Sequence, residues 1–358
     1  MGLDVNDVAW RRSLGLSAAV LALACGGPAE ATETGDGESS TSVETGEVSG
    51  SESASESGDA SSTGGGSEAT TGDEGGGETG GEPFVLVVET RLEGDAFVVD
   101  TNLPARVDAC ATLPELGAPC EDLDEDGLVD AWEDVMLDRL RPVQRMDEQE
   151  QLFDDPNFVL ANVGRVVPFG PANYHAYLML GYTKDFGSCG VSSHNGDSER
   201  VAWRLEDHAD GMAGAAIVRA VYTAAHEGTI SDGGRIVEGG DMATLTYTSV
   251  YDAGEPRWVV FPSADKHASY PTLDACESVS IVPCLDEDCG PDGVGNVADF
   301  DRIPDFVNAG EEAAPRVTSL DAIGFPGDEA WADQDFCGGL GGTGCSSPVR
   351  EKLLNNPF

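Results

Sequence analysis

Beyond residue 143, apolar and polar residues alternate in short runs, and this spacing predicts strands. Gly, Pro, Asn and Asp interrupt the runs at intervals, which is typical of turns between strands. We expect strands over residues 158–167, 174–183, 200–206, 217–223, 243–251 and 258–261. Short strands without long helices between them predict a mainly β fold, an antiparallel β-sandwich.

The start of the chain has a different pattern, typical of a targeting segment. Arg11 and Arg12 precede an uncharged apolar run over residues 13–24. This run is shorter than the ~20 residues of a transmembrane helix, so it indicates a signal peptide. It ends in Leu-Ala-Leu-Ala-Cys25-Gly, which resembles a bacterial lipobox. That resemblance implies removal of residues 1–24 and lipidation of Cys25, whereas an ordinary secretory signal would be cleaved near Ala24 without lipid.

Residues 25–82 are expected to form a disordered tether. After Cys25 the stretch contains fourteen acidic residues, no Lys or Arg and no aromatic residue. Such a composition buries too little apolar surface to offset chain entropy. We therefore expect a lipid anchor in the membrane, a tether, a strand with a calcium loop and helix (residues 83–142) and a β-sandwich (residues 143–358). Gly26 lacks the aspartate-type signal for inner-membrane retention, which favours the outer membrane or cell surface.

Charge limits the classes of partner. The chain carries 66 acidic and 19 basic residues, a formal net charge of −47. This balance repels phosphate backbones and excludes nucleic acid as a partner. Divalent cations are the natural counter-charge.

The nine cysteines indicate an oxidising compartment. With Cys25 lipidated, an even number remains for disulfides, although the sequence does not choose their pairing. Two pairs are close enough to close local loops, and no Cys-x-x-Cys spacing supports a zinc site. The eight disulfide candidates are Cys110, Cys120, Cys189, Cys276, Cys284, Cys289, Cys337 and Cys345.

Residues 122–133 carry an oxygen-ligand pattern for calcium. Their spacing fills every position of the twelve-residue EF-hand loop, including the glycine turn at Gly127. Helical spacing of Trp132, Met136 and Leu140 predicts a helix that leaves the loop and ends before Pro142. No entering helix is expected, so the loop resembles the single calcium loops of dockerins and thrombospondin-type repeats. The expected ligands are Asp122, Asp124, Asp126, the Leu128 carbonyl, Asp130 and Glu133.

The strand around residue 200 suggests a second metal site. Asp197 and Glu199 alternate onto the same face as Val201, Trp203 and Leu205. Carboxylates that enter a core need a cation or a proton, because an unpaired buried charge is costly. We expect Asp185, His194, Asp197 and Glu199 to bind Ca²⁺, Mg²⁺ or Mn²⁺ together. The alternative is that Asp197 and Glu199 form surface ion pairs with neighbouring arginines.

The strings Tyr182-Thr-Lys-Asp185 and His194-Asn-Gly-Asp-Ser-Glu199 resemble two related families. They are similar to the metal-binding region of necrosis- and ethylene-inducing-peptide-like proteins (NLPs), which are secreted cytolytic β-sandwiches. They are also similar to the His-x-Gly-Asp-x-Glu of the vacuolar-sorting (Vps-type) domain family, as are residues 222–228 and 266–271. The resemblance implies that the four residues above are metal ligands. Ser198 replaces the usual tryptophan, which puts cytolytic activity in doubt.

The sequence is compatible with three functions. We favour a non-enzymatic binding module for a glycan, a lipid headgroup or a surface polymer. A structural or adhesive surface lipoprotein is the first alternative. A metal-dependent hydrolase is the second, with His226 or His267 lining the site and assisting proton transfer, although no nucleophile motif accompanies them. His226 and His267 can equally satisfy backbone groups at strand ends.

Overall fold

Strands dominate the part of the chain that the computed structural model describes. These residues are 83–154, 160–187, 193–225, 234–279, 287–292, 296–316 and 349–358. The expected signal peptide, Cys25 and the tether lie outside them. So do His226 and four of the cysteines, namely Cys189, Cys284, Cys337 and Cys345.

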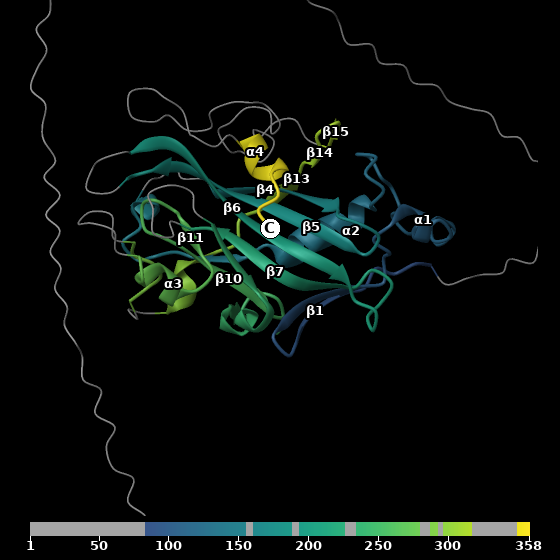
Figure 1. The fold of residues 1–358 in the computed structure, drawn as a ribbon, viewed down its shortest axis with the longest axis horizontal. Coiled ribbons are helices and arrows are strands. Elements are labelled where there is room, and N and C mark those ends of the chain that lie inside the picture. Colours follow the sequence, from purple (N-terminus) through teal and green to yellow (C-terminus); the bar gives the residue numbers. More distant parts are fainter. Residues whose placement is uncertain are drawn as a thin grey trace, which may run out of the picture. The chain divides into compact units, whose positions relative to one another are not determined.

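The larger sheet has the strand order β1-β2-β7-β6-β5-β4-β13, and β8 also pairs with β7 (Figure 1). Its pairings are antiparallel except for β13, which runs parallel to β4. The longest strands, β5 and β6, pair over nearly their whole length. The strand bounds are β1 Val88–Glu93, β2 Ala96–Thr101, β4 Leu160–Pro168, β5 Asn173–Asp185, β6 His194–Asp207, β7 Ala216–Ala224, β8 Gly234–Glu238 and β13 Phe306–Asn308.

The smaller sheet has the order β11-β10-β3-β12, with β9 also paired to β10. Here β10 and β3 are parallel, while the other pairings are antiparallel. A separate hairpin, β14–β15, follows β13. The bounds are β3 Val143–Arg145, β9 Thr246–Thr248, β10 Arg257–Pro262, β11 Ser269–Tyr270, β12 Asp301–Arg302, β14 Gly310–Glu311 and β15 Ala314–Pro315.

One helix of eleven residues, α2 (Asp130–Leu140), packs into the core, as its apolar spacing predicts. Arg141 leaves the helical conformation directly before Pro142, which agrees with the restriction that proline places on its preceding residue. None of the described helices is long and apolar enough to cross a membrane. The remaining helical segments are α1 Val107–Cys110, η1 Pro114–Leu116, η2 Gln151–Asp154, η3 Gly239–Thr244, α3 Leu273–Glu277, η4 Val297–Phe300 and α4 Val349–Leu354.

The main core contains side chains from both sheets and from α2. Trp203 of β6 meets Trp258 of β10 edge to face, with ring centroids 5.8 Å apart. Trp132 of α2 is fully buried in the same cluster and donates its indole N–H to the Gly214 carbonyl at 2.8 Å. The mainly β prediction is therefore confirmed. Because β2 pairs with β7, residues 83–142 and 143–358 contribute to one sheet and one core.

One expected strand is largely wrong. Within residues 243–251 only Thr246–Thr248 forms a strand, and the 3₁₀ helix η3 occupies the preceding positions. Val250 and Tyr251 follow in a turn and are 69% and 40% exposed. The Tyr251 hydroxyl donates to the Ala298 carbonyl and to Asp301 Oδ2 from this turn, and neither residue extends the strand.

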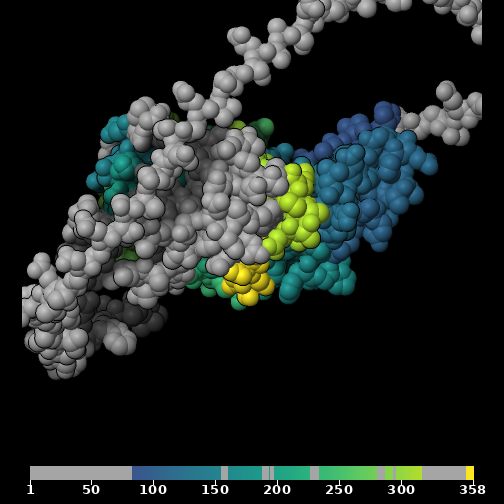
Figure 2. Space-filling view, turned by 90° about the horizontal axis from the view of Figure 1, so that it is seen from above, coloured from purple at the N-terminus to yellow at the C-terminus, as the bar shows by residue number. Residues whose placement is uncertain are grey.

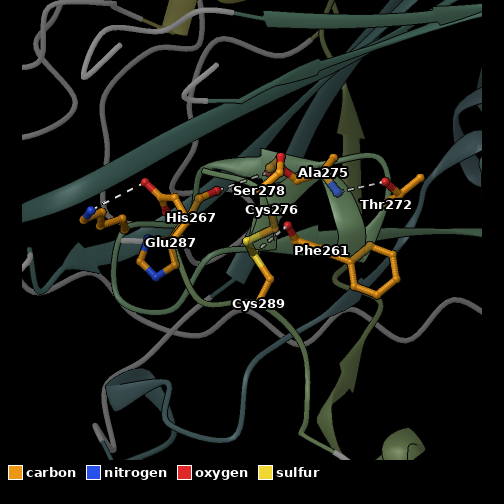
Figure 3. The surroundings of a disulfide bond; sticks show 10 residues. Phe261, His267, Thr272, Ala275, Cys276, Ser278, Glu287 and Cys289 are labelled. Carbon is orange, nitrogen blue, oxygen red and sulfur yellow. Dashed lines mark hydrogen bonds and ion pairs between the residues drawn. A yellow bond between two sulfur atoms is a disulfide. The ribbon is translucent and has the colours of Figure 1, made fainter. Parts of the chain in front are cut away.

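Two disulfides join described cysteines. Cys110 pairs with Cys120, as their short separation suggested, and Cys276 pairs with Cys289. The second bond ties α3 to the segment that bridges to Ser263 after β10 (Figure 3). Disulfide bonds of this kind are typical of proteins in oxidising compartments.

Close packing between α2 and the larger sheet depends on Gly164 in β4. A Cβ at this position would lie 2.9 Å from the Leu137 side chain and 2.8 Å from the Tyr177 carbonyl oxygen. We expect Gly164→Ala to destabilise the protein by about 1–3 kcal/mol in denaturant unfolding. Gly240→Ala is the matched control, because nothing lies within 4 Å of its Cβ position. It should leave stability unchanged or slightly raised, and equal effects of the two variants would contradict this packing.

Candidate metal centre

Backbone contacts hold the middle of the calcium loop against residues 105–107. Val107 N–H donates to the Gly127 carbonyl and Val129 N–H to the Ala105 carbonyl, at 3.3 and 2.9 Å. Gly127 has a φ of 88°, a conformation that favours glycine over other residues. The Cys110–Cys120 disulfide closes the segment directly before the loop. The loop therefore sits on a fixed frame before any ion is considered.

Five acidic side chains of the loop gather into two overlapping groups. Oxygens of Asp122, Asp124 and Asp130 lie within 4.8 Å of one another, and so do oxygens of Asp124, Asp126 and Glu133. Asp124 belongs to both groups, so the two groups form one cluster. Asp124 is 2% exposed and Glu133 is fully buried. Leu128 lies in the same loop, where the sequence pattern predicts that its carbonyl oxygen is a ligand.

In three of these carboxylates, one oxygen accepts a backbone hydrogen bond and the other oxygen has no hydrogen-bond partner. Asp122 Oδ2 accepts from Gly127 N–H at 3.1 Å, Asp124 Oδ2 from Glu311 N–H at 3.0 Å, and Asp126 Oδ1 from Leu128 N–H at 2.7 Å. The other oxygen of each is buried without a hydrogen-bond partner, as is Glu133 Oε1. Backbone amides thus fix each carboxylate while leaving one oxygen for another ligand.

Four unpartnered oxygens in a buried cluster are costly unless a cation contacts them. Calcium takes six to eight oxygen ligands, which matches the carboxylates and the carbonyl of this loop. The residues therefore fit a hard divalent cation. Calcium would supply the positive charge that the carboxylates lack.

Burial and the neighbouring carboxylates raise the pKa values of two of these side chains. Burial, assisted by Asp124 and Asp122, raises the pKa of Asp126 to about 7. Burial and the neighbouring Asp126 and Asp124 raise the pKa of Glu133 to about 10. A cation that binds at neutral pH must therefore displace protons from this cluster.

A distant segment completes the surroundings of the loop. Figure 2 shows the atoms of residues near 310 against the early part of the domain. Glu311 contacts Asp124 through its amide, and Arg316 Nη1 lies 3.5 Å from Glu133 Oε2. Arg316 Nη2 also lies 3.1 Å from Asp134 Oδ2. Sequence reasoning missed both residues, because no local pattern links positions separated by more than 180 residues.

The strand site is only partly described. The β5–β6 register pairs Asp185 with His194, Tyr182 with Asp197, and Leu180 with Glu199. Asp197 and Glu199 thus extend beside the core residues of β5, as their alternation predicts. The same register puts Asp185 on the opposite face of β5 from Tyr182 and Leu180. The His194 side chain lies outside the described residues, so the four-ligand site remains a prediction.

A buried histidine contacts the Asp197 end of this site. His267 Nδ1 lies 2.9 Å from Asp197 Oδ2, and His267 Nε2 lies 3.5 Å from Glu150 Oε2. The Tyr182 ring stacks on the imidazole with centroids 4.0 Å apart. Burial by itself lowers the pKa of His267, but hydrogen bonding to Asp197 and Glu150 raises it to about 10. A protonated His267 therefore serves as a counter-charge for Asp197.

The sequence suggested His267 as a lining residue but gave no sign of Glu150. Glu150 accepts N–H groups from Leu152 and Asp265, at 3.0 and 2.9 Å. Its position beside His267 depends on the turn over residues 263–268, where Asp265 and His267 have positive φ. The sequence does not predict this charged pair, because its two residues are far apart in the chain and no local pattern links them.

Comparisons with known proteins add little to this geometry. No family model matches the chain, and no curated protein does either. One solved structure, described as "Toxin fold for microbial attack and plant defense", is 20% identical with a TM-score of 0.18, over 35% of this chain and 60% of that one. Another, "NLPPya in complex with mannosamine", is 19% identical with a TM-score of 0.17, over 34% and 59%. The match spans less than two thirds of either structure, and neither defines a site for this chain.

Glu133→Gln tests the calcium loop. Glutamine resembles the protonated carboxyl, so calcium-free stability should be unchanged, while the calcium-induced rise in melting temperature should largely disappear. For the parent we expect about 2.7 kcal/mol of stabilisation at a calcium concentration of about 100 times Kd. Glu125→Gln is the matched control, since Glu125 lies in the loop but is exposed. A parent protein whose melting temperature ignores calcium would contradict the site.

His267→Gln tests the buried charge pair. Loss of the imidazolium leaves Asp197 and Glu150 without their counter-charge, and we expect a loss of about 3–5 kcal/mol near pH 6. The folded pKa of about 10 exceeds the ordinary 6.5, so this contribution is complete below pH 6.5 and declines as pH rises toward 10. Chemical unfolding at several pH values measures it.

His208→Gln is the control for this variant, because His208 pairs with the partly exposed Glu93 at 2.8 Å. A surface pair of this kind contributes about 0–1 kcal/mol. Equal costs for the two variants, or a His267 contribution that grows above pH 7, would refute the buried pair.

Proposed function

We propose that this protein is an exported, calcium-organised and non-enzymatic recognition module that binds a neutral glycan. The observation that carries the proposal is the carboxylate cluster of the calcium loop, with its four buried and unpartnered oxygens. The module is displayed from a lipid on Cys25 through the tether of residues 25–82, at the outer membrane or cell surface. The second divalent cation expected at Asp185, His194, Asp197 and Glu199 is not part of this proposal, because His267 already supplies a counter-charge to Asp197.

Calcium in this loop has an organising role. Five carboxylates and a carbonyl from consecutive turns of the loop use up the oxygen positions that calcium prefers. Catalytic metal sites keep a position open for water or substrate, and this ligand set does not favour one. The ion therefore holds the loop, the start of α2 and the Glu311 amide in one arrangement.

Charge favours a neutral ligand. A net charge of −47 creates a negative potential that opposes nucleic acids and anionic lipid headgroups. Neutral polyhydroxylated ligands experience no such repulsion. A glycan whose recognition uses hydrogen bonds and apolar contacts is therefore favoured among the outer-surface ligands.

A glycan array and a liposome panel test the function. The full extracellular chain should bind neutral glycans in millimolar calcium and lose most of this binding in EGTA. Glu133→Gln should behave like the EGTA sample, and Glu125→Gln like the parent. Neutral and anionic liposomes should remain unbound.

Other results would assign the chain differently. A calcium-stabilised protein that binds nothing on either panel would be a structural surface protein. Equal glycan binding in calcium and in EGTA would show that binding does not need the ion, and would contradict the proposal.

A further inference from the structure

A groove of about 630 Å³ opens directly beside the calcium loop. This volume lies in the range of small-ligand sites. Its walls come from the loop, the start of α2, strand β13 and the β14–β15 hairpin. The lining residues used below are Leu123, Asp134, Phe306, Asn308, Pro315 and Arg316.

The polar side chains of the groove hold one another in place. Asn308 Nδ2 donates to Asp134 Oδ1 at 3.1 Å, and Arg316 Nη2 donates to Asp134 Oδ2 at 3.1 Å. Asn308 Oδ1 in turn accepts from Gly310 N–H at 3.1 Å. The carboxylate, amide and guanidinium each have more hydrogen-bonding sites than these contacts use.

Planar groups with spare donors and acceptors suit sugar hydroxyls, because each hydroxyl both donates and accepts. Apolar surface lies beside them. Leu123 is 66% exposed, and Phe306 and Pro315 contribute to the wall. The Arg141 guanidinium covers the Phe306 ring at 5.3 Å and helps to fix it. Such a mixture can contact both the hydroxyls and the C–H faces of a pyranose.

Both walls of the groove are joined to calcium ligands. Leu123 lies between Asp122 and Asp124 in the chain, and Asp134 follows Glu133. Arg316 contacts Glu133 and Asp134 together, at 3.5 and 3.1 Å. An ion that fixes the loop carboxylates therefore also fixes the positions of Leu123 and Asp134.

We propose that this groove binds a short neutral saccharide and that its affinity depends on calcium in the adjoining loop. This assignment rests on the proposed glycan-binding function and names the site for it. Asp134, Asn308 and Arg316 hydrogen-bond the hydroxyls, while Leu123 and Phe306 contact the apolar face of the sugar. The net negative charge of the chain disfavours acidic saccharides in the same groove.

Titration calorimetry with a panel of neutral disaccharides of glucose, mannose and galactose tests the groove on the full extracellular chain. Asp134→Ala and Leu123→Ser should each weaken binding by about tenfold or more, the scale of one lost hydrogen bond to a charged group or one lost apolar contact. Neither residue is an expected calcium ligand, so the calcium-induced rise in melting temperature should persist in both variants. That rise also shows that the variants fold.

Matched controls lie elsewhere on the surface. Asp210→Ala removes an exposed carboxylate, and Val250→Ser removes an apolar side chain that is 69% exposed. Both should bind the saccharide as the parent does. Backbone amide shifts of residues 123 and 308 in NMR spectra should move on titration.

The failures are distinguishable. Saccharide binding that survives Asp134→Ala and Leu123→Ser unchanged overturns the groove while leaving the glycan-binding function standing. Binding in the groove that is equal in EGTA overturns its dependence on calcium. A blank response to both the disaccharide panel and the glycan array overturns the function and the groove together.

Discussion

The burial of several carboxylates side by side in residues 122–133 is the constraint around which this domain is arranged. Backbone amides hold one oxygen of Asp122, Asp124 and Asp126, and the other oxygens point into a common space. Such a cluster is tolerated only when protons or a cation reduce its charge. The raised pKa values of Asp126 and Glu133 express this demand in the absence of an ion. An external divalent cation would reduce this charge while the carboxylates stay ionised.

A second acidic cluster is balanced from within the chain. Asp197 and Glu150 flank His267, which is completely buried and stacked on Tyr182. The imidazolium is compact and has two donors, so one residue contacts both carboxylates. Buried carboxylates therefore occur in two places in this fold, and their negative charge is balanced differently in each. In the loop, Arg316 contacts Glu133 but four carboxylate oxygens stay unpartnered and would accept an added cation. Around His267, the positive charge comes from the chain itself.

Local pattern predicted much of this architecture. Alternation located β4, β5, β7 and β10 to within two residues at each end, whereas β6 begins six residues before the expected start at residue 200. The loop spacing identified each acid of the two groups that form in the described residues. Failures came where non-local contacts decide the outcome. Thr246–Thr248 is short because Val250 is largely exposed and the Tyr251 hydroxyl bonds to Ala298 and Asp301 from a turn. Glu150, Glu311 and Arg316 reach their partners through turns and a parallel strand, and chain spacing carries no record of such contacts.

The pairing of β13 with β4 has a consequence for the order of folding. This pairing places Glu311 beside Asp124, which is 187 residues earlier in the chain. The hydrogen bond from Glu311 to the loop therefore forms only after a late part of the domain has been synthesised. Contacts of such long sequence separation form late, because their loop-closure entropy must be offset first. Until the β14–β15 hairpin has formed its contacts, the loop carboxylates lack both the Glu311 amide and the Arg316 guanidinium. A cation would therefore meet the complete site only after residues 310–316 are in place.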